Sequence, residues 1–228
     1  MSSVLRVFGS ARLRTDSDGF GVTTLICSAG CPLRCAYCIN PDSWDGTGEF
    51  KSFTVDGLYN YVKRDNLYFL ATNGGLVFGG GEPLLSLDFI KEFINKYKST
   101  GWRFSIETSL SVEIDDFELL NSLFDYFIVD SKDMNKERYE LYTKGNFDLF
   151  EHNLKKLLET CGPEKICVRV PVIPILHKKD EYKDNVAVLK KMGFTQIDAF
   201  EYINPSDRKQ ISDAARLNKK SFVDIVNQ

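Results

Sequence analysis

The sequence lacks several features that would place it in familiar functional classes. No run of apolar residues approaches the length of a membrane span, and no apolar secretory segment opens the chain. The net charge is −3 and there is no basic tail, which argues against a protein held on nucleic acid by phosphate contacts alone. No low-complexity segment or clear linker divides the 228 residues, so we expect a single domain. Because there is no secretory segment or membrane span, we expect this domain to be cytoplasmic and without membrane contact.

Cysteine is too sparse for a disulfide scaffold, because six cysteines are few for a chain of 228 residues, and we expect reduced thiols. The cysteines are nevertheless unevenly placed. Three of them fall in one short segment, Cys31-Pro32-Leu33-Arg34-Cys35-Ala36-Tyr37-Cys38. A cubane cluster of four irons needs four ligands, so three thiolates from this loop would leave one iron open to a small molecule.

A structural zinc site is the alternative interpretation of the same cysteines. Such sites usually have four protein ligands, often in two paired knuckles. The candidates for a fourth ligand are Cys27, Cys161, Cys167, His152 and His177. None of them belongs to a second knuckle, so the spacing favours a single iron–sulfur cluster. We expect the three other cysteines to be small core residues or bystanders, His152 to lie on a helix surface and His177 to lie in a loop.

Apolar, β-branched or aromatic runs alternate with amphipathic stretches along the chain. The runs predict strands at 22–27, 76–78, 103–107, 126–130, 166–172 and 196–200. The stretches between them predict helices at 54–63, 86–97, 115–123, 147–158, 180–192 and from 210 onward. Strands separated by helices form parallel sheets, so we predict an α/β fold, a partial (β/α)6 TIM-like barrel. A doubly wound sheet is the competing architecture.

Polar and glycine-rich residues follow the predicted strands at their carboxyl ends. They are Gly80-Gly81-Glu82, Glu107-Thr108, Asp130 and Lys132, with Arg169 inside the fifth predicted strand. Both architectures place ligands at this edge of the sheet, so the sequence predicts an active site there.

The cysteine loop joined to Gly80-Gly81-Glu82-Pro83 resembles the radical S-adenosylmethionine superfamily. Further segments look like the glycyl-radical-enzyme activating enzymes, of which the pyruvate formate-lyase activating enzymes are an example. These segments are 18–22, 39–44, 107–108, 130–132 and 169–170. The similarity extends to about Pro174. It implies one radical S-adenosylmethionine domain over 1–228, with a core at about 20–203 and a C-terminal helix at about 209–228.

The resemblance implies a catalytic 4Fe–4S cluster held by Cys31, Cys35 and Cys38. S-adenosylmethionine would bind the open iron, and its reductive cleavage would give a 5′-deoxyadenosyl radical that takes a hydrogen atom from the substrate. Tyr37 would lie near the adenine. The other residues implied in cofactor binding are Gly80, Gly81 and Glu82 at the methionine ammonium group, Lys132 and Arg169 at the carboxylate, and Glu107, Ser109 and Asp130.

A monovalent cation is a further expectation, because Glu107, Thr108 and Asp130 supply the oxygen ligands that a hard cation prefers. The family commonly has aspartate at the position of Glu107. The chain also departs from the family at Phe20, where proline is usual, and at Val22 or Thr23, where an arginine is usual. It has no histidine in 201–205, where Tyr202 or Asn204 would stand in.

The expected substrate is a glycine of a partner glycyl radical protein, and the expected electron donor is a reductant such as flavodoxin or ferredoxin. We expect the enzyme to be a monomer. One alternative keeps the radical chemistry but directs it at a peptide or a small molecule. The other is a non-catalytic iron–sulfur or zinc-binding module.

Overall fold

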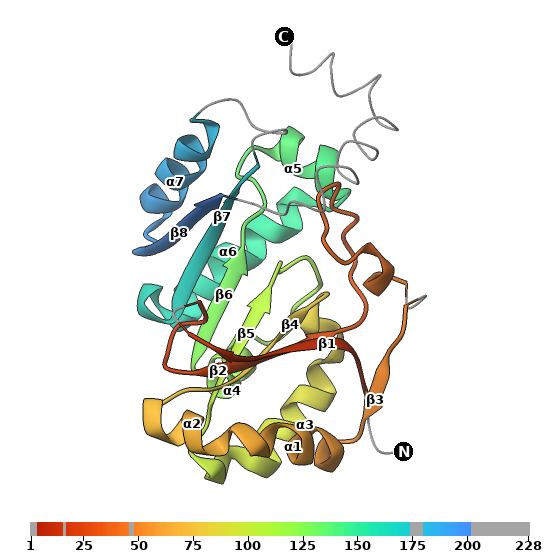
Figure 1. Cartoon of the computed structure of the whole chain (residues 1–228). Helices are drawn as coiled ribbons and strands as arrows, with labels where there is room; N and C mark the ends of the chain where they lie inside the picture. Colours follow the sequence, from red (N-terminus) through yellow and green to blue (C-terminus); the bar gives the residue numbers. More distant parts are fainter. Residues whose placement is uncertain (1–3, 16, 46–47, 174–179, 202–228) are drawn as a thin grey trace.

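An open sheet of eight strands organises the computed structural model, which describes residues 4–15, 17–45, 48–173 and 180–201 (Figure 1). The strand order is β3-β1-β2-β4-β5-β6-β7-β8. The parallel strands are β2 (Thr23–Ser28), β4 (Gly75–Gly80), β5 (Arg103–Thr108), β6 (Tyr126–Asp130), β7 (Ile166–Val172) and β8 (Gln196–Glu201). They correspond to the strands predicted from the sequence and confirm the partial (β/α)6 barrel. Within the described residues the sheet does not close, since β3 and β8 are its two edges.

Two antiparallel strands that were not predicted extend the sheet beyond β2. They are β1 (Leu5–Arg14) and β3 (Lys51–Phe53). The sequence predicts a core that begins at about residue 20. Only Leu5 and Val7 are buried in β1, so its apolar alternation is too short to indicate a strand. Its partners in β2 and β3 come later in the chain.

Seven α-helices lie in the described residues: α1 (Val55–Val62), α2 (Asn66–Thr72), α3 (Leu87–Tyr97), α4 (Phe117–Leu123), α5 (Lys136–Thr143), α6 (Phe147–Cys161) and α7 (Glu181–Met192). Short 3-10 turns lie at Pro41–Ser43, Lys63–Asp65, Pro83–Ser86, Lys98–Thr100 and Pro163–Lys165. The sequence predicted all of these α-helices except α2 and α5. The helix expected from residue 210 lies outside the described residues. Where the chain is described, no helix is both long and apolar enough to cross a membrane.

The two missed helices lack the apolar stripe on which a helix prediction depends. In α2 the side chains of Leu67 and Leu70 are exposed, and Phe69 is the buried one. In α5 the buried positions are Tyr139, Tyr142 and Thr143, which do not form an aliphatic pattern. The helix is nevertheless fixed at its start, because the Asn135 side chain accepts a hydrogen bond from the Arg138 N–H at 3.0 Å.

The two faces of the sheet have different neighbours, because successive side chains of a strand point to opposite faces. Large apolar residues on the outer face pack against the helices in one core. Examples are Ile26, Phe78, Ile106, Val129 and Val168. A small apolar cluster fills the inner face of the partial barrel and consists of Leu25, Val77, Tyr126 and Ile128. The next inward positions along these strands therefore lie directly above this apolar floor, at the carboxyl ends.

Candidate cofactor site at the strand ends

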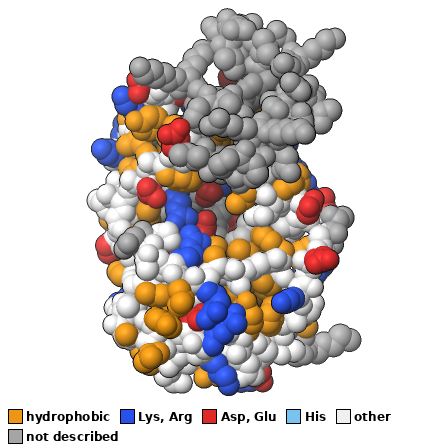
Figure 2. Space-filling view, viewed as in Figure 1, with side chains coloured by type: hydrophobic (Ala, Val, Ile, Leu, Met, Phe, Trp, Pro, Cys, Tyr) orange, Lys and Arg blue, Asp and Glu red, His pale blue; other side chains and the backbone are white. Residues whose placement is uncertain are grey.

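A cavity of about 330 Å³ lies at the carboxyl ends of the parallel strands, where the barrel architecture predicted an active site. Most predicted site residues line it: Cys31, Cys35, Tyr37, Cys38, Gly80, Gly81, Glu107, Thr108, Ser109, Asp130, Lys132 and Arg169. Among the predicted site residues that the structure describes, only Glu82 does not line it. Figure 2 shows basic and acidic side chains next to one another in the middle of the face that it presents.

The cysteine loop is held in shape by its own backbone and by its neighbours. Cys38 N–H donates to the Cys35 carbonyl at 3.0 Å, which closes a tight turn between two of the expected ligands. The Arg34 guanidinium donates to the carbonyl of Cys31 at 2.7 Å and to that of Leu33 at 2.9 Å. Arg34 also lies over the ring of Trp44, at 5.2 Å from its centroid. These contacts use the backbone and the Arg34 side chain, so none of the three thiols takes part in them.

The three thiols fit an iron–sulfur cluster better than a single metal ion. Burial raises the pKa of Cys35 to about 12 and that of Cys31 to about 11, so a bound metal is needed to hold them as thiolates at neutral pH. In the part of the chain that the structure describes, no three cysteine, histidine or acidic side chains are grouped as ligands of one metal ion. The ligands of a cubane bind separate irons, whereas zinc draws all its ligands to one centre.

Gly80 and Gly81 are required by the way the chain crosses itself. Gly80 has a φ of +97°, a backbone conformation that residues with a side chain rarely adopt. A Cβ there would collide with the backbone of Cys27. At Gly81 a Cβ would collide with the carbonyl oxygen of Gly30. The Gly81 N–H donates to the Ser28 carbonyl at 2.9 Å. Both glycines therefore join the second parallel strand directly to the start of the cysteine loop.

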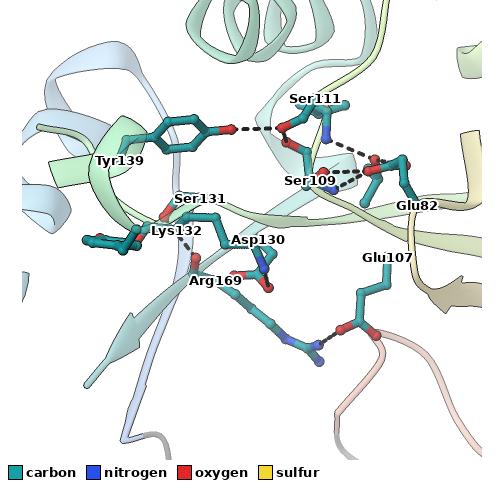
Figure 3. Close-up of polar contacts among 12 residues, drawn as sticks. Glu82, Glu107, Ser109, Ser111, Asp130, Ser131, Lys132, Tyr139 and Arg169 are labelled. Atoms are coloured by element: carbon teal, nitrogen blue, oxygen red, sulfur yellow. Dashed lines mark hydrogen bonds and ion pairs between the residues drawn. The ribbon is translucent and has the colours of Figure 1, made fainter. Parts of the chain in front are cut away.

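Glu82 is fully buried and is not among the residues that line the cavity, so its expected role at the methionine ammonium group stays a prediction. Figure 3 shows Glu82 beside Ser109, which directly follows β5. Thr108 Oγ1 donates to it at 2.7 Å, and Ser109 donates from its N–H at 2.9 Å and from its hydroxyl at 2.6 Å. Burial raises the pKa of Glu82, and these hydrogen bonds oppose the rise. Glu82 thus fixes the positions of Thr108 and Ser109, both of which line the cavity.

Two ion pairs provide the charge of the cavity wall (Figure 3). Arg169 Nη1 lies 2.9 Å from Glu107 Oε1, and Lys132 Nζ pairs with Asp130 Oδ2. Burial alone would lower the pKa of both cations, but Asp130 raises that of Lys132 and Glu107 raises that of Arg169. Both side chains are therefore charged at neutral pH. They suit a ligand that carries a carboxylate.

The residues expected to bind a monovalent cation do not form an open ligand set. Glu107 is paired with Arg169, and the Thr108 hydroxyl donates to Glu82. One oxygen of Asp130 pairs with Lys132, while its Oδ1 is buried without a hydrogen-bond partner. Burial raises the pKa of Glu107, whereas the Arg169 charge lowers it. Side chains of the protein thus neutralise the carboxylates that the cation was expected to bind.

The positions that depart from the family pattern have structural roles where they are described. The rings of Phe20 and Tyr126 pack edge-to-face, with 5.2 Å between centroids, and the Arg103 guanidinium lies over the Phe20 ring, 4.3 Å from its centroid. Thr23 Oγ1 donates to Asp18 at 2.7 Å. Asp18 in turn lies 3.5 Å from the Arg169 guanidinium, which links this segment to the cavity wall. Tyr202, Asn204 and His177 lie outside the described residues.

Cys27 was expected to be a core residue or a bystander, but it lines the cavity together with Trp44 and Phe200. The sequence did carry a signal for Cys27, because it follows the inward-facing Leu25 by two positions in the same strand. Cys161 is buried in the helical core, and Cys167 lies against the apolar floor. His152 is exposed on α6, as predicted.

Comparisons with known proteins agree with this arrangement. The sequence profile of the Radical SAM superfamily matches residues 25–215. A pyruvate formate-lyase-activating enzyme of Clostridium pasteurianum is 31% identical over 175 residues, which make up 75% of this chain and 69% of that enzyme. The 4-hydroxyphenylacetate decarboxylase activating enzyme of Clostridioides difficile is 26% identical over 271 residues, with 91% of this chain and 85% of that enzyme covered.

The fold has a counterpart among solved structures. QueE from Escherichia coli superimposes with a TM-score of 0.54 at 15% sequence identity, and the match covers 94% of this chain and 91% of that one. At this identity the likeness concerns the fold alone.

Proposed function

Because the chain belongs to the radical S-adenosylmethionine superfamily, we propose that it is an activating enzyme for a glycyl radical protein. Its reaction would be the removal of a hydrogen atom from a glycine Cα of that partner. Two relatives that cover most of the chain are activating enzymes, of pyruvate formate-lyase and of 4-hydroxyphenylacetate decarboxylase. A reductant such as flavodoxin or ferredoxin would supply the electron.

The observation that carries the proposal is the cavity that brings three thiols and two cationic side chains together at one edge of the sheet. Cys31, Cys35 and Cys38 would hold the cluster, and Lys132 and Arg169 would face the carboxylate of S-adenosylmethionine. When bound, cluster and S-adenosylmethionine supply a 5′-deoxyadenosyl radical as the hydrogen-abstracting species. The protein contributes binding, orientation and the exclusion of water.

The substrate would enter from the open side of the barrel. The sheet ends at β3 and β8 instead of closing in the described part of the chain, and a protruding loop of another protein would enter at this open side. Apolar residues on the cavity wall, among them Leu25, Leu33 and Ile39, would shield the reacting atoms from water. The family's monovalent cation would need Glu107 and Asp130, and we expect Arg169 and Lys132 to replace its charge.

The first test is cleavage of S-adenosylmethionine by the anaerobically reconstituted protein with dithionite. We expect 5′-deoxyadenosine from the wild type and none from Cys35→Ala. The second test adds a glycyl radical protein from the same organism, labelled with deuterium at the glycine α-carbon. Deuterium in the 5′-deoxyadenosine and a glycyl radical signal by electron paramagnetic resonance would support the activating role.

The two tests separate the family chemistry from the partner. Cleavage with no deuterium transfer from any glycyl radical protein would refute the activating role and leave the radical chemistry intact. Deuterium transfer from a labelled peptide or small molecule would instead support the alternative substrate class.

A further inference from the structure

Helix α5 forms the support on which the cysteine loop rests. Two carbonyl groups at its C-terminal end accept hydrogen bonds from the loop backbone. The Tyr142 carbonyl accepts from the Ala36 N–H at 2.8 Å, and the Thr143 carbonyl accepts from the Arg34 N–H at 2.7 Å. The last carbonyls of a helix have no partner within the helix, so the loop satisfies groups that would otherwise need water.

The Tyr142 side chain connects this helix to a second segment of the candidate site, the turn after β6, which carries the cavity residue Lys132. Its hydroxyl donates to Asp133 Oδ2 at 2.7 Å and lies 3.1 Å from the Lys132 carbonyl oxygen. Its ring meets that of Tyr37, with 5.7 Å between the centroids. Tyr142 is 2% exposed. One buried side chain thus touches both the cysteine loop and the segment that carries the cavity lysine.

The backbone at Lys132 adopts a conformation that a lysine rarely has. Its φ is +58°, in the left-handed region. Such a conformation persists only where neighbouring contacts fix it. Ser131 N–H donates to the Arg169 carbonyl at 3.0 Å on one side, and Asp133 accepts from Arg138 Nε at 2.8 Å on the other. The Tyr142 hydroxyl contacts the carbonyl of Lys132 itself.

The direction of the lysine side chain depends on this turn. Lys132 Nζ pairs with Asp130, lies 5.9 Å from the centroid of the Tyr37 ring and lines the cavity. If the backbone relaxed to an ordinary negative φ, the Cα–Cβ bond would point elsewhere and the ammonium group would leave the cavity wall.

We propose that Tyr142 is a positioning residue for S-adenosylmethionine: its hydroxyl holds the left-handed turn at Lys132 and thereby aims the ammonium group at the carboxylate of the ligand. This role concerns the superfamily's own cofactor and does not depend on the partner proposed above. The α5 helix thus sets the relative position of the cysteine loop and the lysine.

The test variant is Tyr142→Phe, which removes the hydroxyl and keeps the ring and the backbone carbonyl. Iron content should stay near the wild-type value, and the melting temperature should fall by only a few degrees, because Asp133 keeps its ion pair with Arg138. The dissociation constant for S-adenosylmethionine, measured by equilibrium titration of the reconstituted protein, should rise about tenfold, as for loss of one buried hydrogen bond to a charged group. Tyr68→Phe on α2 is the matched control, because Tyr68 is 50% exposed, and it should bind like the wild type.

A double-mutant cycle with Lys132→Met separates positioning from a general structural role. If Tyr142 acts through Lys132, adding Tyr142→Phe to Lys132→Met should weaken binding no further. The proposal is overturned by wild-type affinity in Tyr142→Phe, by a full additional loss in the Lys132→Met background, or by failure of Tyr142→Phe to load iron. The last result would place the hydroxyl in the support of the cluster loop itself.

Discussion

Arg169 and Glu107 form an ion pair across the inner face of the barrel, with 2.9 Å between Nη1 and Oε1. The guanidinium comes from β7 and the carboxylate from β5, and β6 runs between them. The pair places a positive charge of the protein at the carboxylate for which the family resemblance implied a monovalent cation.

This pair predicts that the enzyme does not need a monovalent cation. The affinity for S-adenosylmethionine and the rate of 5′-deoxyadenosine formation should be the same in sodium, potassium and choline salts at equal ionic strength. The reason is that Glu107 and Asp130 each have a cationic partner already. A several-fold higher rate in sodium alone would contradict this expectation. In Arg169→Gln, which frees Glu107, we expect weaker binding that sodium partly restores.

The cysteine loop predicts that alanine substitution of a loop cysteine lowers the iron content, whereas substitution of a core cysteine does not. Cys35→Ala should reduce bound iron well below the wild-type content and abolish 5′-deoxyadenosine formation, because the loop offers only three thiolates to the cluster. Cys161→Ala is the matched control, since Cys161 is also buried but lies in the helical core. Iron analysis and the visible absorption spectrum check both variants. Equal iron loss in the two would show that the effect comes from unfolding.

Two glycines allow a matched test of the close chain crossing beside the cavity. Gly81→Ala should lower the melting temperature by several degrees and reduce iron loading, because a Cβ would collide with the Gly30 carbonyl oxygen. Gly9→Ala should leave both unchanged, since nothing lies within 4 Å of a Cβ there. Differential scanning fluorimetry and iron analysis give the readouts. Tolerance of alanine at Gly81 would mean that the loop can move away from β4.

Asp65 predicts how stability depends on pH. Burial alone would raise the pKa of Asp65, but hydrogen bonds from Arg12 and Thr24 outweigh this effect and leave the pKa below its usual value. The ionised form is therefore stabilised in the folded state, and this contribution is present above the ordinary pKa of aspartate and is lost as the pH falls through the lowered value.

The measurement is the melting temperature of wild type and Asp65→Asn between pH 3 and pH 7. The variant should melt several degrees lower at neutral pH, and the gap should narrow in acid. A gap that is constant with pH would show that the loss is one of packing or of neutral hydrogen bonding.

The part of the site that could be predicted from sequence is the part carried by local motifs. Cys31 to Cys38 lie in one loop, and Glu107 and Asp130 end strands that were recognisable from their apolar runs. Because parallel strands end at the same edge, these residues had to meet.

The remaining features depend on contacts between segments far apart in the chain. The residues next to Glu82 in the sequence do not indicate that Thr108 and Ser109 donate hydrogen bonds to its carboxylate. The contact of Tyr142 with Lys132 escaped prediction because α5 buries tyrosines and so lacks the aliphatic periodicity of a buried helix. Strand β1 was missed because only Leu5 and Val7 are buried in it, which leaves too short an apolar alternation to indicate a strand.

The cysteine loop is tied to the rest of the protein by contacts that do not involve its sulfur atoms. Arg34 and Ala36 bind the end of α5, and the Glu82 N–H donates to the Gly30 carbonyl at 2.7 Å. After oxygen has destroyed the cluster, the cysteine loop should therefore keep its backbone conformation and the protein should stay folded. Restoration of activity after oxidative damage would then be a matter of resupplying iron and sulfide to a folded protein, and the same molecule could be repaired many times without being made anew.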